Sequence, residues 1–110
     1  MYVYDVANNL AKAIQERKEY KEYKKAKEEV QAVPEMKAKI DEFEKIRYEV
    51  QVMSFQGDQQ DEEKMKKLQE MYDILMKEPK IKEYFDIEVR FNIMLADVNK
   101  IISESVKDLL

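Results

Sequence analysis

The chain has 110 residues, 45% of them hydrophobic and 40% charged, with one glycine, two prolines and a formal net charge of −4 at pH 7. This length suits one small domain covering residues 1–110, and so few turn-forming residues favour long helices over strands. Lys and Glu are interspersed, so no basic field for nucleic acid is expected, and the lack of cysteine and histidine excludes disulfides, cysteine-ligated clusters and Ser-His catalytic pairs.

A first helix is predicted from Asp5, which is a good N-cap residue. Apolar residues around it recur at helical spacing and line one face: Val3, Val6, Ala7, Leu10, Ala13 and Ile14. After this face the pattern changes phase and resumes about 150° round the helical wheel. No glycine or proline marks the change, so we expect a kink or short break between Arg17 and Glu19.

The segment from Glu16 to Glu29 is mostly Lys and Glu, with a thin apolar stripe that includes Tyr20 and Tyr23. This pattern is typical of a solvated helix stabilised by neighbouring opposite charges, and a dedicated binding surface is the alternative. Pro34 is predicted to end this helix and to open the next one, because proline fits the first turn of a helix and biases the preceding residue away from helical geometry.

The third helix is predicted to carry a heptad-like core face that runs to Gly57, a natural C-cap. Its apolar residues follow at steps of 4, 3, 3, 4 and 3: Met36, Ile40, Phe43, Ile46, Val50 and Met53. A second apolar stripe lies on the opposite side and covers only the last turns: Tyr48, Val52 and Phe55.

A loop is predicted from Gln56 to Asp61, followed by a fourth helix that Asp58 or Asp61 caps. The apolar face of this helix comprises Met65, Leu68, Met71, Tyr72, Leu75 and Met76. Pro79 is predicted to stop the fourth helix and to start the last one.

The last helix is predicted to run from Pro79 to Leu110 and to be apolar on nearly all sides of its first half. One broad face comprises Tyr84, Ile87, Phe91, Met94, Leu95, Val98, Ile101, Ile102, Val106 and Leu109. A second stripe comprises Phe85, Val89 and Ile93. We therefore expect the first half of this helix to lie inside a bundle or an oligomer, and the second half to pack on one side.

No group of side chains predicts a catalytic, cofactor-binding or metal site. The run Asp61-Glu62-Glu63 offers oxygen ligands but matches no calcium-binding loop, and an acidic first turn is ordinary in helices. Seven methionines and seven tyrosines at helical spacing indicate core and half-buried positions; an adaptable methionine groove or base stacking are the alternatives. We therefore expect a protein that is not an enzyme and has no cofactor.

The two second stripes predict a binding surface, because exposed apolar patches on a small protein usually mark a partner. Self-association is the simplest case, and most such assemblies have two-fold symmetry. The alternative is that the first two helices fold over these stripes. The residues predicted at an oligomer or partner interface are Tyr48, Val52, Phe55, Phe85, Val89 and Ile93.

Several short motifs together resemble the YheA/YmcA/YlbF family of small bacterial proteins, and most closely its YheA-like branch. They are Val3-Tyr4-Asp5-Val6-Ala7-Asn8-Asn9-Leu10, Glu19-Tyr20-Lys21-Glu22-Tyr23, the Pro34-led helix with Phe43, the Gly57 break and Pro79-Lys80-Ile81. The resemblance implies an all-helical fold that self-associates. The relatives YlbF and YmcA act in competence, sporulation and biofilm formation through a complex that influences RNase Y. Their cysteines are associated with iron–sulfur clusters, which a chain without cysteine cannot share.

Together these observations predict an all-α bundle of four to five helices, with long, heptad-patterned third and C-terminal helices. We expect a cytoplasmic, non-enzymatic homo-oligomer that acts as an interaction or regulatory module, with itself and other proteins as partners. No apolar run approaches the ~20 residues that span a bilayer, and the N-terminus does not have the pattern of a signal peptide. The alternatives are an RNA-processing factor that acts through an RNase Y complex, a factor that binds RNA through Lys64, Lys66 and Lys67, and an enzyme with an unusual site of Tyr, Lys and carboxylates.

Overall fold

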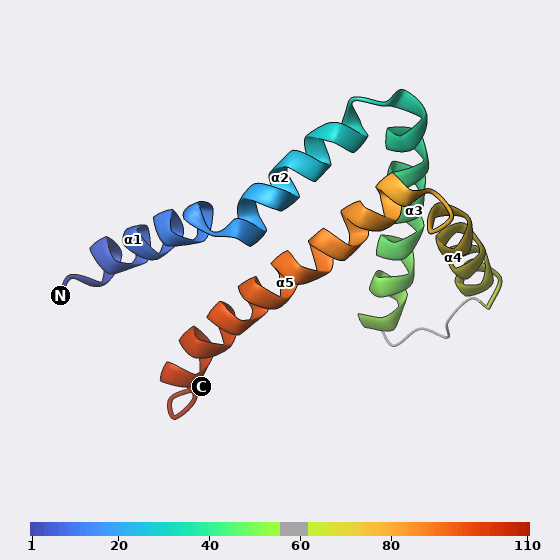
Figure 1. The fold of residues 1–110 in the computed structure, drawn as a ribbon. Coiled ribbons are helices and arrows are strands. Elements are labelled where there is room, and N and C mark those ends of the chain that lie inside the picture. The colour runs from blue at the N-terminus through green and yellow to red at the C-terminus, as the bar shows by residue number, and fades with distance from the viewer. Residues whose placement is uncertain (56–61) are drawn as a thin grey trace. The chain divides into compact units, whose positions relative to one another are not determined.

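The computed structural model describes residues 1–55 and 62–110, and within them it contains five α-helices and no strand (Figure 1). The helices are α1 (Val3–Glu16), α2 (Lys18–Gln31), α3 (Pro34–Phe55), α4 (Glu62–Leu75) and α5 (Pro79–Ser105). The two longest are α3, with 22 residues, and α5, with 27. The predicted all-α class, with a long third and a long last helix, is confirmed.

Prolines start both long helices, as predicted: α3 begins at Pro34 and α5 at Pro79. In each case the carbonyl oxygen of the residue before the proline accepts the first hydrogen bond of the new helix. The N–H of Lys37 donates to Val33, and that of Lys82 donates to Glu78, both at 3.0 Å. Proline has no N–H to lose in the first turn and its φ angle suits a helix, so these two positions are favourable starts.

The predicted break after the first helix is also confirmed. Arg17 has φ −71° and ψ 148°, which is extended backbone, and its N–H donates to the carbonyl of Ile14 at 3.1 Å. One extended residue therefore ends α1 and lets α2 begin at Lys18 with its apolar face in a new direction.

Both outer boundaries of the helical chain differ from the prediction. The first helix begins at Val3, because the carbonyl oxygen of Tyr2 accepts hydrogen bonds from the N–H groups of Asp5 and Val6 at 3.1 and 3.2 Å. The prediction of Asp5 as the N-cap is therefore wrong, and its carboxylate instead lies in the first turn, where the helix dipole favours a negative charge.

The last helix ends at Ser105 and does not reach Leu110. The hydroxyl of Ser105 donates to the carbonyl of Ile102 at 2.6 Å, which is the acceptor that the N–H of Val106 would use in a continued helix. That N–H bonds to Ser103 instead, at 3.3 Å, and turns follow. The predicted loop from Gln56 to Asp61, with its caps Gly57, Asp58 and Asp61, lies outside the described residues.

The chain divides into two compact units. One comprises residues 1–27 and 84–110, and the other comprises residues 28–83. The prediction of one domain over residues 1–110 stays a prediction.

The unit of residues 28–83 has a core between α3 and α4, which pack against each other. Three residues of the predicted heptad face are buried, namely Ile40, Phe43 and Ile46. The ring of Phe43 lies 6.2 Å from that of Tyr72 on α4, centroid to centroid. These contacts confirm that the heptad face of α3 is its core face.

The unit of residues 1–27 and 84–110 is held together by aromatic side chains of α2 and α5. The ring of Tyr23 lies 5.8 Å from that of Tyr84 and 5.1 Å from that of Phe91, and Tyr20 also approaches Phe91, at 6.4 Å. The Tyr23 hydroxyl donates to Oε2 of the buried Glu88 at 3.2 Å. The aromatic stripe of α2 is therefore a packing surface, in agreement with its helical spacing.

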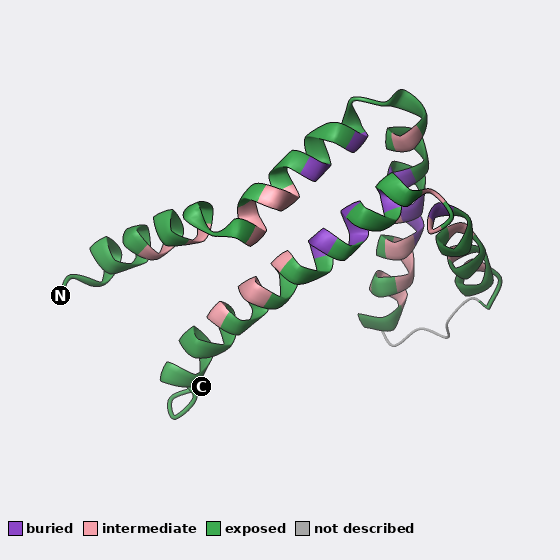
Figure 2. Cartoon of the chain, in the orientation of Figure 1, coloured by how far each residue is buried: buried purple, intermediate pink, exposed green. Residues whose placement is uncertain are grey.

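Burial is unevenly distributed along α1 and α5, as Figure 2 shows. α1 contains no buried residue. In α5 the buried residues are confined to its first part: Ile81, Tyr84, Phe85, Ile87 and Glu88. The broad apolar face of α5 is thus half-buried from Phe91 to Val98 and exposed from Ile101 onward, and the expectation that its second half packs on one side stays a prediction.

Candidate functional site

Two of the three residues in the predicted interface stripe on α3 are exposed. The side chains of Tyr48 and Phe55 are exposed, and that of Val52 is half-buried. All three lie in the unit of residues 28–83.

The predicted stripe on α5 changes from buried to exposed along its length. Phe85 is only 7% exposed, whereas Val89 is 54% exposed and Ile93 is similarly exposed. Residues four apart on a helix are rotated by about 40°, so the stripe drifts away from the buried face with each turn. Phe85 belongs to the edge of that buried face and is a core residue of the chain, and only Val89 and Ile93 remain at the surface.

A groove lies beside the exposed part of α5, within the unit of residues 1–27 and 84–110. Its volume is about 450 Å³. Four of its lining side chains are apolar residues of α5, named here the floor: Ile93, Met94, Val98 and Ile101. The other six are charged residues of α5 and of the join of α1 and α2, named here the rim: Arg17, Lys18, Glu19, Glu22, Arg90 and Asp97.

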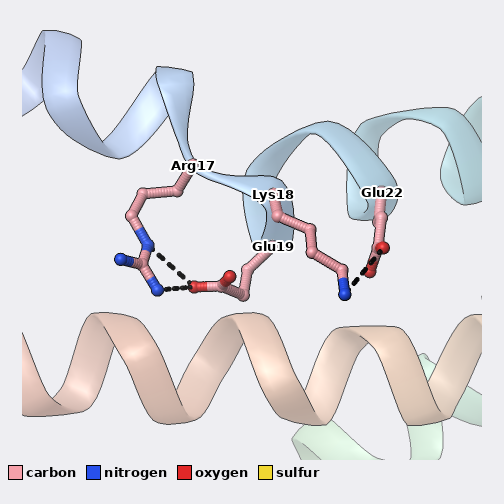
Figure 3. A network of polar contacts seen from close by, with 4 residues as sticks. All are labelled: Arg17, Lys18, Glu19 and Glu22. Atoms are coloured by element: carbon pink, nitrogen blue, oxygen red, sulfur yellow. Dashed lines mark hydrogen bonds and ion pairs between the residues drawn. The ribbon is translucent and has the colours of Figure 1, made fainter.

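Part of the charged rim is organised by the break between α1 and α2 (Figure 3). Nε and Nη2 of Arg17 donate to Oε2 of Glu19 at 2.9 and 2.7 Å. Residues two apart do not face each other in a regular helix, so the extended backbone at Arg17 is what lets this pair form. The hydrogen bond from Arg17 lowers the pKa of the Glu19 carboxyl from its usual value. Lys18 forms a further ion pair with Glu22 at 3.8 Å.

The charges that line the groove are balanced. Its rim has three basic and three acidic side chains, and two of the basic groups already pair with rim carboxylates.

In the described part of the chain, no group of three or more acidic residues is arranged to hold a metal ion. Among the same residues, no helix combines the length and apolar character that crossing a membrane requires.

The sequence predicts Ile93 as an interface residue but does not predict the groove. Met94, Val98 and Ile101 lie on the broad face that is expected to pack on one side, and no role is predicted for the rim residues. A usable signal was present in α1, because only Asp5, Lys12 and Glu16 are charged among its 14 residues. So few charges are unusual for a helix without a buried residue in a chain that is 40% charged.

Comparisons with known proteins identify relatives over nearly the whole chain. Residues 3–107 match the family described as "Control of competence regulator ComK, YlbF/YmcA". A UPF0342 protein of Caldicellulosiruptor bescii is 33% identical over 105 residues, covering 96% of this chain and 88% of the relative. A UPF0342 protein of Symbiobacterium thermophilum is 35% identical, with 94% and 93% covered.

A solved structure has the same fold. It is described as a protein of unknown function (DUF964) from Bacillus stearothermophilus, and it matches with a TM-score of 0.82 over 97% of this chain and 94% of that one. The sequence identity is 17%, so this likeness concerns the fold alone.

Proposed function

Because the chain belongs to the YlbF/YmcA family, we propose that it is a cytoplasmic, non-enzymatic protein that regulates by contact with other proteins. The description of the family names the control of a regulator and no reaction. The observation that carries the proposal is apolar surface: large apolar side chains are exposed in both units, among them Tyr48, Phe55, Val89, Ile93 and Ile101. Such surface usually marks a partner.

Self-association is the first contact that we propose. A second copy of the chain is always present at the same concentration, and its surface can match itself across a two-fold axis. The stripes predicted from sequence supply candidate positions in each unit, apart from the buried Phe85.

Self-association is tested by light scattering coupled to gel filtration, over a concentration series of the full chain. The expected result is a mass of at least twice 13.3 kDa at high concentration, which falls on dilution. A mass of 13.3 kDa at every concentration would contradict self-association.

The regulatory role is tested by crosslinked affinity capture of the tagged protein from its native cells, with and without nuclease. Recovery of a defined regulatory or RNA-processing complex that survives nuclease supports action through protein contacts. Recovery that nuclease abolishes would favour the alternative of a nucleic-acid-associated factor. Recovery of this chain alone would argue against the regulatory role and leave only self-association.

A further inference from the structure

The apolar face of α1 is only partly covered in the unit to which α1 belongs. Val3 is 68% exposed and Val6 is also exposed, while Leu10 and Ile14 are only half-buried. An isolated helix of 14 residues is marginal in water, and helices in proteins derive most of their stability from packing an amphipathic face. α1 therefore needs an apolar surface against which to pack.

The charge content of α1 also indicates a packed helix. Three of its 14 residues are charged, whereas nine of the 14 residues of α2 are Lys or Glu. A helix that remained in solvent on all sides would be polar all round, whereas α1 has an apolar face.

The groove beside α5 offers a surface of the required kind in the same unit. Its floor is apolar, and the apolar face of α5 continues beyond it with Ile102 and Leu109, which are exposed. Its rim is balanced, with three basic and three acidic side chains, so it favours an occupant with little net charge. A strongly charged partner, such as a nucleic acid or an acidic peptide, would meet as many repulsive as attractive groups.

We propose that the groove of each copy holds the apolar face of α1 from a second copy. The contact is reciprocal about a two-fold axis, because each copy has one α1 and one groove. α1 meets the requirement for an occupant of low charge, since it carries one basic and two acidic residues. This inference names the surface of the self-association proposed above and rests on that proposal.

The available apolar area agrees with a stable dimer. A fully buried Val or Leu side chain removes roughly 60–120 Å² of apolar surface from water. Ten partly exposed side chains at about half that area provide on the order of 500 Å² per copy. They are Val3, Val6, Leu10, Ile14, Ile93, Met94, Val98, Ile101, Ile102 and Leu109. A standard interface buries ~800 Å² per partner, of which ~65% is apolar in homodimers, and this amounts to a similar area.

The first test compares three double variants of the full chain by sedimentation and light scattering. Ile93→Glu with Ile101→Glu changes the groove floor, and Val3→Glu with Val6→Glu changes its proposed occupant. Val33→Glu with Ile74→Glu is the matched comparison, because it places two charges on exposed side chains of the other unit that lie outside the predicted stripes. All six side chains are exposed in the single chain, so helicity by circular dichroism should be retained in each variant.

The groove and α1 variants are each expected to raise the Kd of the dimer on the order of 1,000-fold, because unpaired charges would be buried in the contact. The comparison variant should associate like the wild type. If the groove or α1 variant associated as tightly as the wild type, the proposed contact surface would be refuted, but self-association would not. An equal rise in Kd in all three variants would also refute the proposed contact surface. A monomeric wild type would overturn the self-association itself.

A second test is disulfide crosslinking. Because the chain has no cysteine, an introduced cysteine is the only thiol in each protein. Val6→Cys is prepared with a large affinity tag and Ile101→Cys without it, and the two proteins are mixed and oxidised. A disulfide between the tagged and untagged chains is expected. In a third sample, both cysteines are placed in one chain at high dilution. A disulfide that forms only within that chain, with none between mixed chains, would show that α1 closes on its own groove and would overturn the proposal.

Discussion

Replacing Ile81 by alanine tests where the core of the unit of residues 28–83 lies. Ile81 is 0% exposed, whereas Ile74, in the same unit, is 58% exposed. Ile→Ala removes three carbon atoms, worth about 2.4 kcal/mol at ~0.8 kcal/mol each when they are fully buried. A buried site adds the free energy of the cavity, so Ile81→Ala should lower the free energy of unfolding by about 2–5 kcal/mol. Ile74→Ala should cost about 1 kcal/mol, since less than half of its side chain leaves water.

The assay is urea unfolding followed by circular dichroism, with both variants and the wild type at one fixed protein concentration, because association contributes to stability. The quantity to compare is the free energy of unfolding of one variant against that of the other, since the unfolded chain contributes about equally to both. A cost for Ile81→Ala no greater than that for Ile74→Ala would refute the reasoning. It would mean that the helix start at Pro79 does not bring Ile81 into a packed core.

Three further predictions concern the other unit. Tyr23→Phe should lower stability by about 1 kcal/mol, because it removes the hydrogen bond to the Glu88 carboxylate; Tyr20→Phe is the control, and equal costs would contradict the role of the bond. Arg17→Ala should raise the pKa of Glu19 toward 4.5, as followed by carboxyl ¹³C NMR, and an unchanged pKa would contradict the pairing. Since the folded-state pKa lies below the unfolded value, the pair stabilises the break at neutral pH, and this contribution is lost as the pH falls through the lowered pKa. Dilution below the Kd should speed amide hydrogen exchange in α1 more than in α2, and equal rates at all concentrations would contradict a dimer-dependent α1.

The helix starts and the core of α3 could be predicted because their causes are local. Pro34 and Pro79 restrict the backbone at and before their own positions, and the structure begins helices at both. The change of phase after Ile14 predicted the break at Arg17 for a similar reason, since one helix cannot present one apolar face in two directions. Asp5 failed as an N-cap because backbone hydrogen bonds to Tyr2 had already started the helix.

The exposure of individual residues could not be predicted in the same way. Phe85 and Val89 occupy the same stripe in sequence, yet one is buried and the other is exposed. The difference depends on how far round the helix neighbouring elements reach at each level, which is a tertiary property. The groove has the same origin, because residues 17–22 and 90–101 meet only after folding, and an apolar floor there has the same spacing as a core face.

The position of the uncovered surface gives the proposed regulation a physical basis. The unit of residues 28–83 has a core of its own in the packed faces of α3 and α4. In the other unit, α2 and α5 pack through aromatic rings, but α1 and the end of α5 contribute exposed apolar residues. Association that orders α1 would therefore alter one part of the molecule while the core of the other persisted. A third protein that bound α1 more tightly than the groove does would compete with self-association. The fraction of copies with an unoccupied groove would then rise with the concentration of that protein.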